Sequence, residues 1–178
     1  MNFFEVIEKR YSHKEKFLPD PVPLKDLELI AKAGLLAPTG NNSQYVRLVI
    51  LPDRASLQPL CDVAPAEGLL TAPAAIAVLT DPSAQKYEWN FEVEDYSAAA
   101  AQMLLAVTAL GYVSVWLDSP YFDEAKQKAA LAVLGAPKGY HLRVVLPVGL
   151  PDGEGKRRDK MAFNERVSYG QFGANVKN

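Results

Sequence analysis

The sequence is poor in the residues from which most catalytic and metal sites are built. Its 178 residues include one cysteine, Cys61, and two histidines, His13 and His141. A single cysteine excludes an internal disulfide and suits a reducing cytoplasm. No HExxH, GxSxG, CxxC or P-loop string occurs. We therefore expect no metal site and no protein nucleophile, and a structural role is the simpler explanation for each histidine.

An excess of charge of one sign is also missing. The chain has 19 Lys and Arg residues against 21 Asp and Glu, a formal net charge of −2, so nucleic acid is not an expected partner. The first ten residues alternate acids and bases and lack an apolar export segment, which again favours the cytoplasm. With 49 % hydrophobic residues, residues 1–178 are expected to form one domain with a large core.

One long stretch carries no charge at all. Residues 96–117 contain no Asp, Glu, Lys or Arg, and residues 98–109 contain only two polar side chains. A helix that is apolar all round has no face for water. We expect this one to be buried on every side, either in its own chain or against a second copy. Gly111 would end the helix, and the β-branched run 113–117 predicts a central strand.

A membrane span is the alternative for this stretch, because residues 98–117 approach the roughly 20 residues that a span requires. Against that reading, the stretch is rich in alanine and is interrupted by Gln102, Thr108, Gly111 and Ser114. No cluster of Lys or Arg flanks it, as would be typical of a membrane helix. We expect a buried helix and no membrane partner.

The rest of the chain predicts helices and strands in mixed order. Apolar residues at helical spacing predict helices at residues 3–10, 24–36, 56–63 and 123–134. In the second helix, the residues expected to face inward are Leu24, Leu27, Ile30, Ala31 and Leu35. Further strands are expected at residues 46–51, 74–80 and 142–150, and Pro147 suggests an edge or a bulge. This order indicates an α+β fold, with a sheet covered by helices on both faces.

The first candidate binding cluster follows the first helix. In an extended chain alternate side chains project to one side, which would place Arg10, Ser12 and Lys14 in a row. Two cations and a hydroxyl in a row suit a phosphate, whereas Tyr11 and His13 would face the other way. The alternative is a solvated strand that carries ordinary surface bases.

Three further segments are candidates. The polar loop at residues 39–44 offers donors and acceptors, on a backbone that Gly and Asn allow to adopt positive φ, as the rim of a heteroaromatic ring would require. The run Lys156–Arg158 lies between a hydrophobic strand and an apolar tail. Tyr87, Trp89 and Phe91 could form a mobile aromatic lid. The alternatives are an ordinary helix-to-strand turn, a solvated charge run and plain packing.

Taken in order, these segments resemble the nitroreductase family of FMN enzymes. Residues 10–14, RYSHK, are similar to the family's RxSxR/K, and residues 37–44, APTGNNSQ, to its APSxxNxQPW. Residues 95–116 resemble the core helix and strand that end in a tryptophan. Residues 146–151, LPVGLP, resemble the late iPiGyP strand, and residues 156–158 the closing KxR. The likeness covers most of the chain.

The resemblance implies a homodimer with a mixed or antiparallel sheet, and two FMN sites at the subunit interface beside the central helix. The phosphate would be held by Arg10, Ser12, Lys14, Lys156 and Arg158. The flavin would be reached from the partner subunit by the loop that contains Pro38, Thr39, Gly40, Asn42 and Gln44. Backbone N–H groups near Asp118 and Ser119 would meet flavin N5. Residues 161–178 would form an arm around the neighbouring subunit.

The implied activity is electron transfer from NAD(P)H to a nitroaromatic or quinone-like acceptor by a ping-pong mechanism. The chain departs from the family pattern at three places. Residues 44–46 lack the usual Pro-Trp, Gln102 replaces an asparagine, and residues 65–68 offer no cation beside flavin N1 and O2. Two other readings stay open: a flavin protein with different redox chemistry, and a non-enzymatic module that binds another phosphate ligand.

Overall fold

A three-stranded antiparallel sheet forms the centre of the computed structural model, which describes residues 1–174. The strands are β1 (Val46–Leu51), β2 (Ala74–Thr80) and β3 (His141–Val148), in the order β1-β2-β3. Ile50 pairs with Ile76 on one side of β2, and Ala77 pairs with Val145 on the other. Because β2 is central, all seven of its residues are buried, which explains its continuous apolar run. The bounds predicted for β1 and β2 are confirmed.

Residues 1–174 also form seven α-helices and three short 3-10 helices. The α-helices are α1 (Phe3–Lys9), α2 (Leu24–Leu35), α3 (Arg54–Val63), α4 (Glu67–Thr71), α5 (Glu92–Ala109), α6 (Glu124–Val133) and α7 (Phe163–Arg166). The 3-10 helices are η1 (Gly40–Asn42), η2 (Pro82–Ala84) and η3 (Ser119–Phe122). Side-chain caps begin three of the α-helices: Asn2 for α1, Asp53 for α3 and Asp123 for α6 each accept from a backbone N–H of the first turn.

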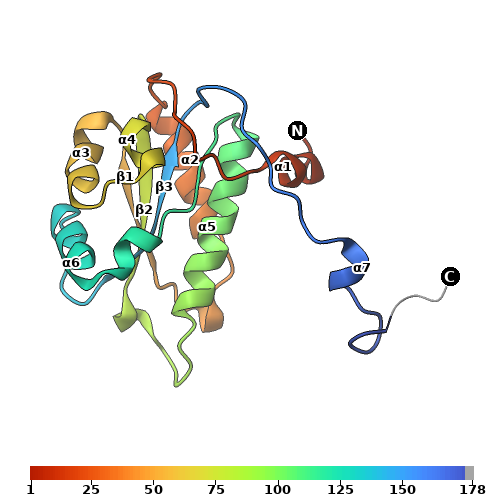
Figure 1. Ribbon diagram of the computed structural model, residues 1–178. Helices are drawn as coiled ribbons and strands as arrows, with labels where there is room; N and C mark the ends of the chain where they lie inside the picture. The colour runs from red at the N-terminus through yellow and green to blue at the C-terminus, as the bar shows by residue number, and fades with distance from the viewer. Residues whose placement is uncertain (175–178) are drawn as a thin grey trace.

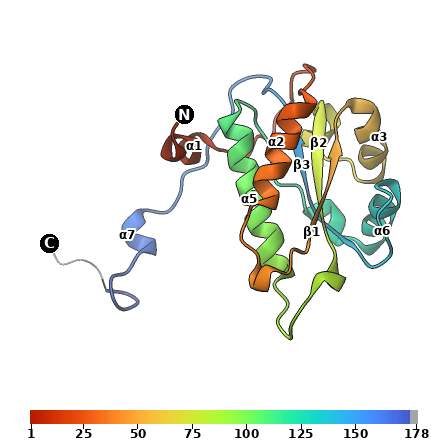
Figure 2. The same cartoon turned by 180° about the vertical axis from the view of Figure 1, so that it is seen from behind.

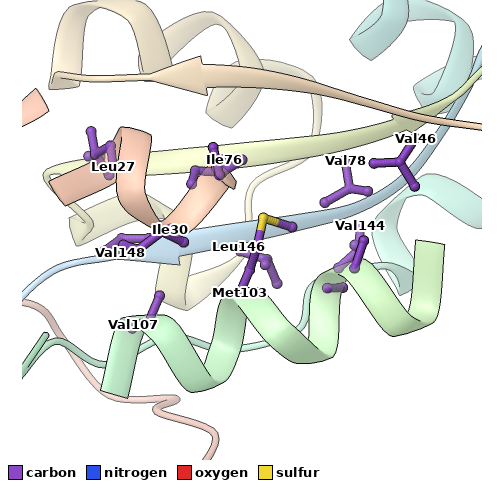
Figure 3. Packing of buried hydrophobic residues seen from close by; sticks show 14 of the residues in the cluster. Leu27, Ile30, Val46, Ile76, Val78, Met103, Val107, Val144, Leu146 and Val148 are labelled. Carbon is purple, nitrogen blue, oxygen red and sulfur yellow. The ribbon is translucent and has the colours of Figure 1, made fainter. Parts of the chain in front are cut away.

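The helices cover both faces of the sheet, as the sequence predicted. Helices α2 and α5 lie on one face, and α3 and α6 lie on the other (Figures 1 and 2). Figure 3 shows the first core, where Met103 of α5 lies among side chains from α2 and the sheet. In the second core, Leu57, Leu60 and Cys61 of α3 pack with Leu142 of β3. The α+β class is confirmed, with an antiparallel sheet.

Cys61 is buried in the second core. Its Sγ lies 3.3 Å from a guanidinium nitrogen of Arg54 and 3.5 Å from the carbonyl oxygen of Leu69. Burial raises the pKa of the Cys61 thiol, although the charge of Arg54 acts in the opposite direction. The thiol is therefore neutral at physiological pH and packs as a small apolar group.

The prediction of a central strand at residues 113–117 is wrong. This segment lies beyond β3 and forms only isolated bridges there, Leu117 to Val145 of β3 and Val113 to Gly149, the residue after β3. In that antiparallel register Pro147 stands opposite Val115, and proline has no N–H to donate. The hydrogen-bond ladder between residues 113–117 and β3 is therefore interrupted between its two bridges. The regular sheet ends at β3, the strand that contains Pro147.

Helix α2 buries a narrower stripe than predicted. Leu27, Ile30 and Ala31 are buried, but Leu24 is 54 % exposed and Leu35 is 60 % exposed. At about 100° per residue, Leu24 and Leu35 lie on the flank of the stripe that faces α5. Gly34 completes the stripe instead, because a β-carbon there would lie 2.7 Å from Met103 Cγ.

Helix α5 is not buried on every side within one chain, so that part of the prediction is wrong for the single subunit. The side that faces α2 and the sheet is buried, including Ala99, Ala100, Met103 and Val107, while Ala101 is exposed. The sheet and α2 cover only part of its circumference. No helix in residues 1–174 is long and apolar enough to cross a membrane.

The C-terminal segment leaves the body of the subunit. After β3 the chain passes α1 and carries α7 well away from the sheet (Figure 1). Large apolar side chains on it are exposed: Met161 at 64 %, Phe163 at 69 % and Phe172 at 104 %. Residues 175–178 of the predicted arm lie outside the described residues. The role of the arm toward a partner stays a prediction.

Candidate functional site

The fold brings two predicted clusters, separated by about 140 residues in the sequence, to one cavity. This phosphate-end cavity has a volume of about 610 Å³. It is lined by Arg10, Tyr11, Ser12, Lys14, Glu15, Lys156, Arg157, Arg158, Asp159 and Lys160. All five residues predicted to hold a phosphate are in this set.

The segment that follows α1 is extended, and its alternation is largely as predicted. Ser12 and Lys14 are exposed, while His13 between them is fully buried. Ser12 forms a parallel bridge with Ser114, and the His13 N–H donates to the Ser114 carbonyl oxygen at 2.9 Å. Tyr11 differs from the prediction, because it lines the cavity instead of facing away from it.

The charge of the phosphate-end cavity favours an anionic ligand. Six of its lining side chains are cationic and two are acidic. The Arg157 guanidinium donates to the Glu8 carbonyl oxygen, which fastens the basic run to the end of α1. Within residues 1–174, no group of three or more His, Cys, Asp or Glu side chains is arranged to hold a metal ion. Phosphate is the natural ligand for clustered Arg and Lys side chains.

The polar loop at residues 39–44 lies at the start of α5. Asn41 and Asn42 both adopt φ of 52°, and Gln44 adopts 57°, which confirms the prediction of positive φ for the asparagines. Gly40 is required for a different reason, because a β-carbon there would overlap the Phe91 ring. The loop is also tied to the chain that precedes α5: the Lys86 Nζ donates to the Asn42 carbonyl oxygen at 2.5 Å.

The predicted aromatic lid lies beside this loop. Tyr87, Trp89 and Phe91 line a second cavity of about 580 Å³ together with Asn41 and Glu88. Tyr87 is 62 % exposed and Trp89 is 68 % exposed, so most of their surface is not used in packing within the chain. This aromatic cavity and the loop at residues 39–44 are one region of the structure.

A buried carboxylate below the aromatic segment was missed by the sequence analysis. Glu92 accepts hydrogen bonds from the Thr80 hydroxyl, from His141 Nδ1 at 2.8 Å and from the Arg143 guanidinium. Burial raises the pKa of the Glu92 carboxyl, but these hydrogen bonds outweigh burial, so its pKa lies below the usual value. The network joins the start of α5 to β2 and β3. No local motif signals it, because its members are far apart in the sequence.

Asp118 and Ser119 lie at a third position, where residues 113–117 lead into η3. The Asp118 carboxylate accepts from the Trp116 indole N–H at 2.8 Å, and Ser119 is the first residue of η3. The Trp116 ring in turn lies 6.0 Å from the Tyr96 ring of α5. Asp118 is thus linked to α5 through Trp116, whereas η3, which begins at Ser119, contacts α6 and β3.

The phosphate-end cavity and the loop at residues 39–44 lie at opposite ends of α5. A smaller cavity that shares Tyr11 also contains Thr108, Gly111 and Tyr112, at the C-terminal end of the helix. The loop at residues 39–44 contacts Asp95, near the N-terminal end. An 18-residue helix is roughly 27 Å long. Within one chain, the residues predicted to bind the phosphate therefore lie roughly one helix length from the loop predicted to contact the flavin ring.

The model of the nitroreductase family fits residues 7–67 and 61–150. The chain belongs to the nitroreductase family. A protein of Archaeoglobus fulgidus, whose name pairs NADH dehydrogenase with NAD(P)H nitroreductase, is 37 % identical over 131 residues. The match covers 73 % of this chain and 75 % of that protein.

Solved nitroreductase structures share the whole fold. A Bacteroides thetaiotaomicron protein, whose name also pairs NADH dehydrogenase with NAD(P)H nitroreductase, superposes with a TM-score of 0.83 at 27 % identity. That likeness covers 96 % of this chain and 98 % of the other. A Desulfovibrio desulfuricans nitroreductase solved in complex with FMN gives a TM-score of 0.82 at 23 % identity, over 97 % of this chain and 98 % of the other.

Proposed function

We propose that this nitroreductase-family protein is an FMN-dependent oxidoreductase. It would pass electrons from NAD(P)H to nitroaromatic or quinone-like acceptors by a ping-pong mechanism. The observation that carries the proposal is the phosphate-end cavity, where Arg10 and Lys14 meet Lys156 and Arg158. The Desulfovibrio relative in complex with FMN and the name of the Archaeoglobus relative support this choice of cofactor and electron donor.

The residues of the phosphate-end cavity fit the terminal phosphate of FMN. The four cations predicted to bind the phosphate line one cavity with the Ser12 hydroxyl, and bidentate or charge-assisted contacts of this kind are the strong ones. Such contacts contribute about 1.5–3 kcal/mol each. Association itself costs an estimated 4–15 kcal/mol, so the flavin ring must be buried as well.

We propose that a second copy of the chain completes the ring site. Pro38, Thr39, Gly40, Asn42 and Gln44 would be supplied by the partner subunit. Three features support this homodimer. The loop at residues 39–44 is roughly one helix length from the phosphate-end cavity of its own chain. Helix α5 has a face that its own chain does not cover, and the segment from residue 161 exposes apolar side chains.

Bound FMN would supply the hydride chemistry, so the chain needs no nucleophile of its own. Its residues would bind and orient. Backbone N–H groups near Asp118 and Ser119 would meet flavin N5, and Tyr87, Trp89 and Phe91 would cover the acceptor. The aromatic cavity is of the size that small ligands occupy, and its exposed rings leave room for a planar substrate.

An absorbance spectrum of the purified protein tests the proposal. We expect a flavin spectrum, or one that appears after FMN is added to the protein and the free cofactor is removed. NADH or NADPH should bleach it, and a nitroaromatic or a quinone should restore it. Protein that binds no FMN would refute the proposal. Flavin that binds but is not reduced by either nucleotide would favour a flavin protein with different chemistry.

A further inference from the structure

Tyr11 joins the two halves of the phosphate-end cavity. Its side chain is half-buried, and its ring lies so close to the backbone at Gly155 that a β-carbon at Gly155 would overlap it. Gly155 directly precedes Lys156. The contact therefore connects the segment that carries Arg10 and Lys14 to the basic run that carries Lys156 and Arg158.

His13 supports Tyr11 from inside the fold. His13 is fully buried, and its Nε2 lies 2.8 Å from the Lys16 carbonyl oxygen, which requires the proton on Nε2. Nδ1 is then an acceptor, and the Tyr11 hydroxyl lies 3.5 Å from it. The His13 ring also packs edge-on against Phe17, at 4.8 Å between ring centroids. The Tyr11 ring thus lies against His13, whose side chain is buried and hydrogen-bonded.

Lys16 and Phe17, which contact His13, also bind the chain segment that leads to Gly155. The Lys16 carbonyl oxygen accepts a second hydrogen bond, from the Asp152 N–H at 2.9 Å, and Phe17 forms a bridge with Pro151. Beyond residue 152 the chain turns at Gly153 and reaches Gly155 under the Tyr11 ring. The position of the basic run therefore depends on the place of this ring.

We infer that Tyr11 is a positioning residue for the phosphate end of the cofactor, an inference that rests on the function proposed above. By lying over Gly155, Tyr11 sets how close Lys156 and Arg158 come to Arg10 and Lys14. The cations can act together on one phosphate only if this spacing is kept, because charge-assisted hydrogen bonds require heavy-atom distances of about 2.7–2.9 Å.

The test compares FMN with riboflavin, which lacks the phosphate, in titrations of the apoprotein followed by flavin fluorescence. Tyr11→Ala should weaken FMN binding by about 10- to 100-fold, the loss expected for one charge-assisted contact. Its riboflavin affinity should stay within about twofold of the wild type. Tyr11→Phe keeps the ring over Gly155 and should keep most of the FMN affinity.

Gly155→Ala provides an independent variant. Alone it should also weaken FMN binding, because its methyl group displaces the Tyr11 ring. In a Tyr11→Ala background, Gly155→Ala should add little further loss, since the clash is gone. Equal losses for FMN and riboflavin, or unchanged FMN binding in both single variants, would overturn the inference while the proposed function stands. Wild-type protein that binds no FMN would instead refute the proposed function.

Discussion

The Gly40 backbone N–H donates to the Asp95 carboxylate at 2.7 Å, which fastens the loop at residues 39–44 to the beginning of α5. Asp95 is 1 % exposed, and its second oxygen has no hydrogen-bond partner among residues 1–174. Burial raises the pKa of the Asp95 carboxyl, with the Gly40 hydrogen bond acting in the opposite direction. The loop that is proposed to contact the partner subunit's flavin is therefore hydrogen-bonded to a carboxyl group whose ionisation is unfavourable in the folded protein.

Asp95→Asn should remove the cost of ionising Asp95 and keep the acceptor for Gly40. In the wild type, a raised folded-state pKa means that the free energy of unfolding falls as pH rises from the ordinary Asp value of about 3.9 through the folded-state pKa. The free energy of unfolding of Asp95→Asn should not show this decrease. The variant should therefore become increasingly more stable than the wild type as the pH rises toward neutral. Urea unfolding at pH 4 and pH 8 measures it. Equal pH slopes in the two proteins would contradict the assignment.

Glu92→Gln should show the opposite dependence. The Glu92 pKa is lowered in the folded state, so the stability it contributes is present above the ordinary Glu value of about 4.3 and is lost as pH falls through the folded-state pKa. The variant should be destabilised by roughly 1–3 kcal/mol at neutral pH, and the difference should shrink in acid. The exposed Glu28 of α2 is the matched control, and Glu28→Gln should change the free energy of unfolding little at neutral pH.

Gly34→Ala should destabilise the protein although it replaces glycine within a helix. Helix propensity alone would favour alanine by about 1 kcal/mol. However, the added methyl carbon would lie 2.7 Å from Met103 Cγ and 2.9 Å from Met103 Sδ, and overpacking of this kind costs about 1–3 kcal/mol. Thermal unfolding would report the sign, and a raised melting temperature would show that Met103 moves aside freely.

Replacing Arg10 and Lys14 together by Ala should abolish FMN retention and leave the fold intact. Two lost charge-assisted contacts correspond to at least about a 100-fold weaker affinity. The matched control is Lys25→Ala with Lys32→Ala, two exposed cations on α2 that do not line the cavity. Circular dichroism checks the fold. Unchanged flavin content in the first variant would show that the phosphate is bound elsewhere.

Removing the segment after residue 160 should separate the proposed dimer and release the flavin. The exposed Met161, Phe163 and Phe172 are the side chains expected to bury apolar surface on the neighbouring subunit. Light scattering gives the mass of the full-length and shortened proteins, and absorbance gives their flavin content. A shortened protein that is still dimeric and yellow would show that the arm is dispensable for both.

Local sequence patterns predicted the parts of this structure that depend on neighbouring residues. Strands β1 and β2 have the expected bounds because each is rich in β-branched and other apolar residues and is followed by turn residues. The burial of His13 between two exposed residues follows from the period of an extended chain. The same period places the Ser12 and Lys14 side chains opposite His13.

Features that depend on distant partners could not be predicted in this way. The strand expected at residues 113–117 fails because Pro147, some 30 residues later, stands opposite it and has no N–H. The Glu92 network joins this residue of α5 to Thr80 of β2 and to His141 and Arg143 of β3. One side of α5 is exposed because the described elements of its own chain do not cover it. A local sequence pattern does not show which elements will pack against a helix.

The burial of Cys61 leaves the surface without a reactive sulfur, since the chain has no other cysteine. Thiol reagents attack the thiolate, and a buried thiol with a raised pKa supplies little of it. A cysteine introduced at the exposed Trp89 would consequently be the preferred target of a fluorophore or a spin label. No native cysteine has to be replaced before such a label is used to test whether the aromatic segment moves.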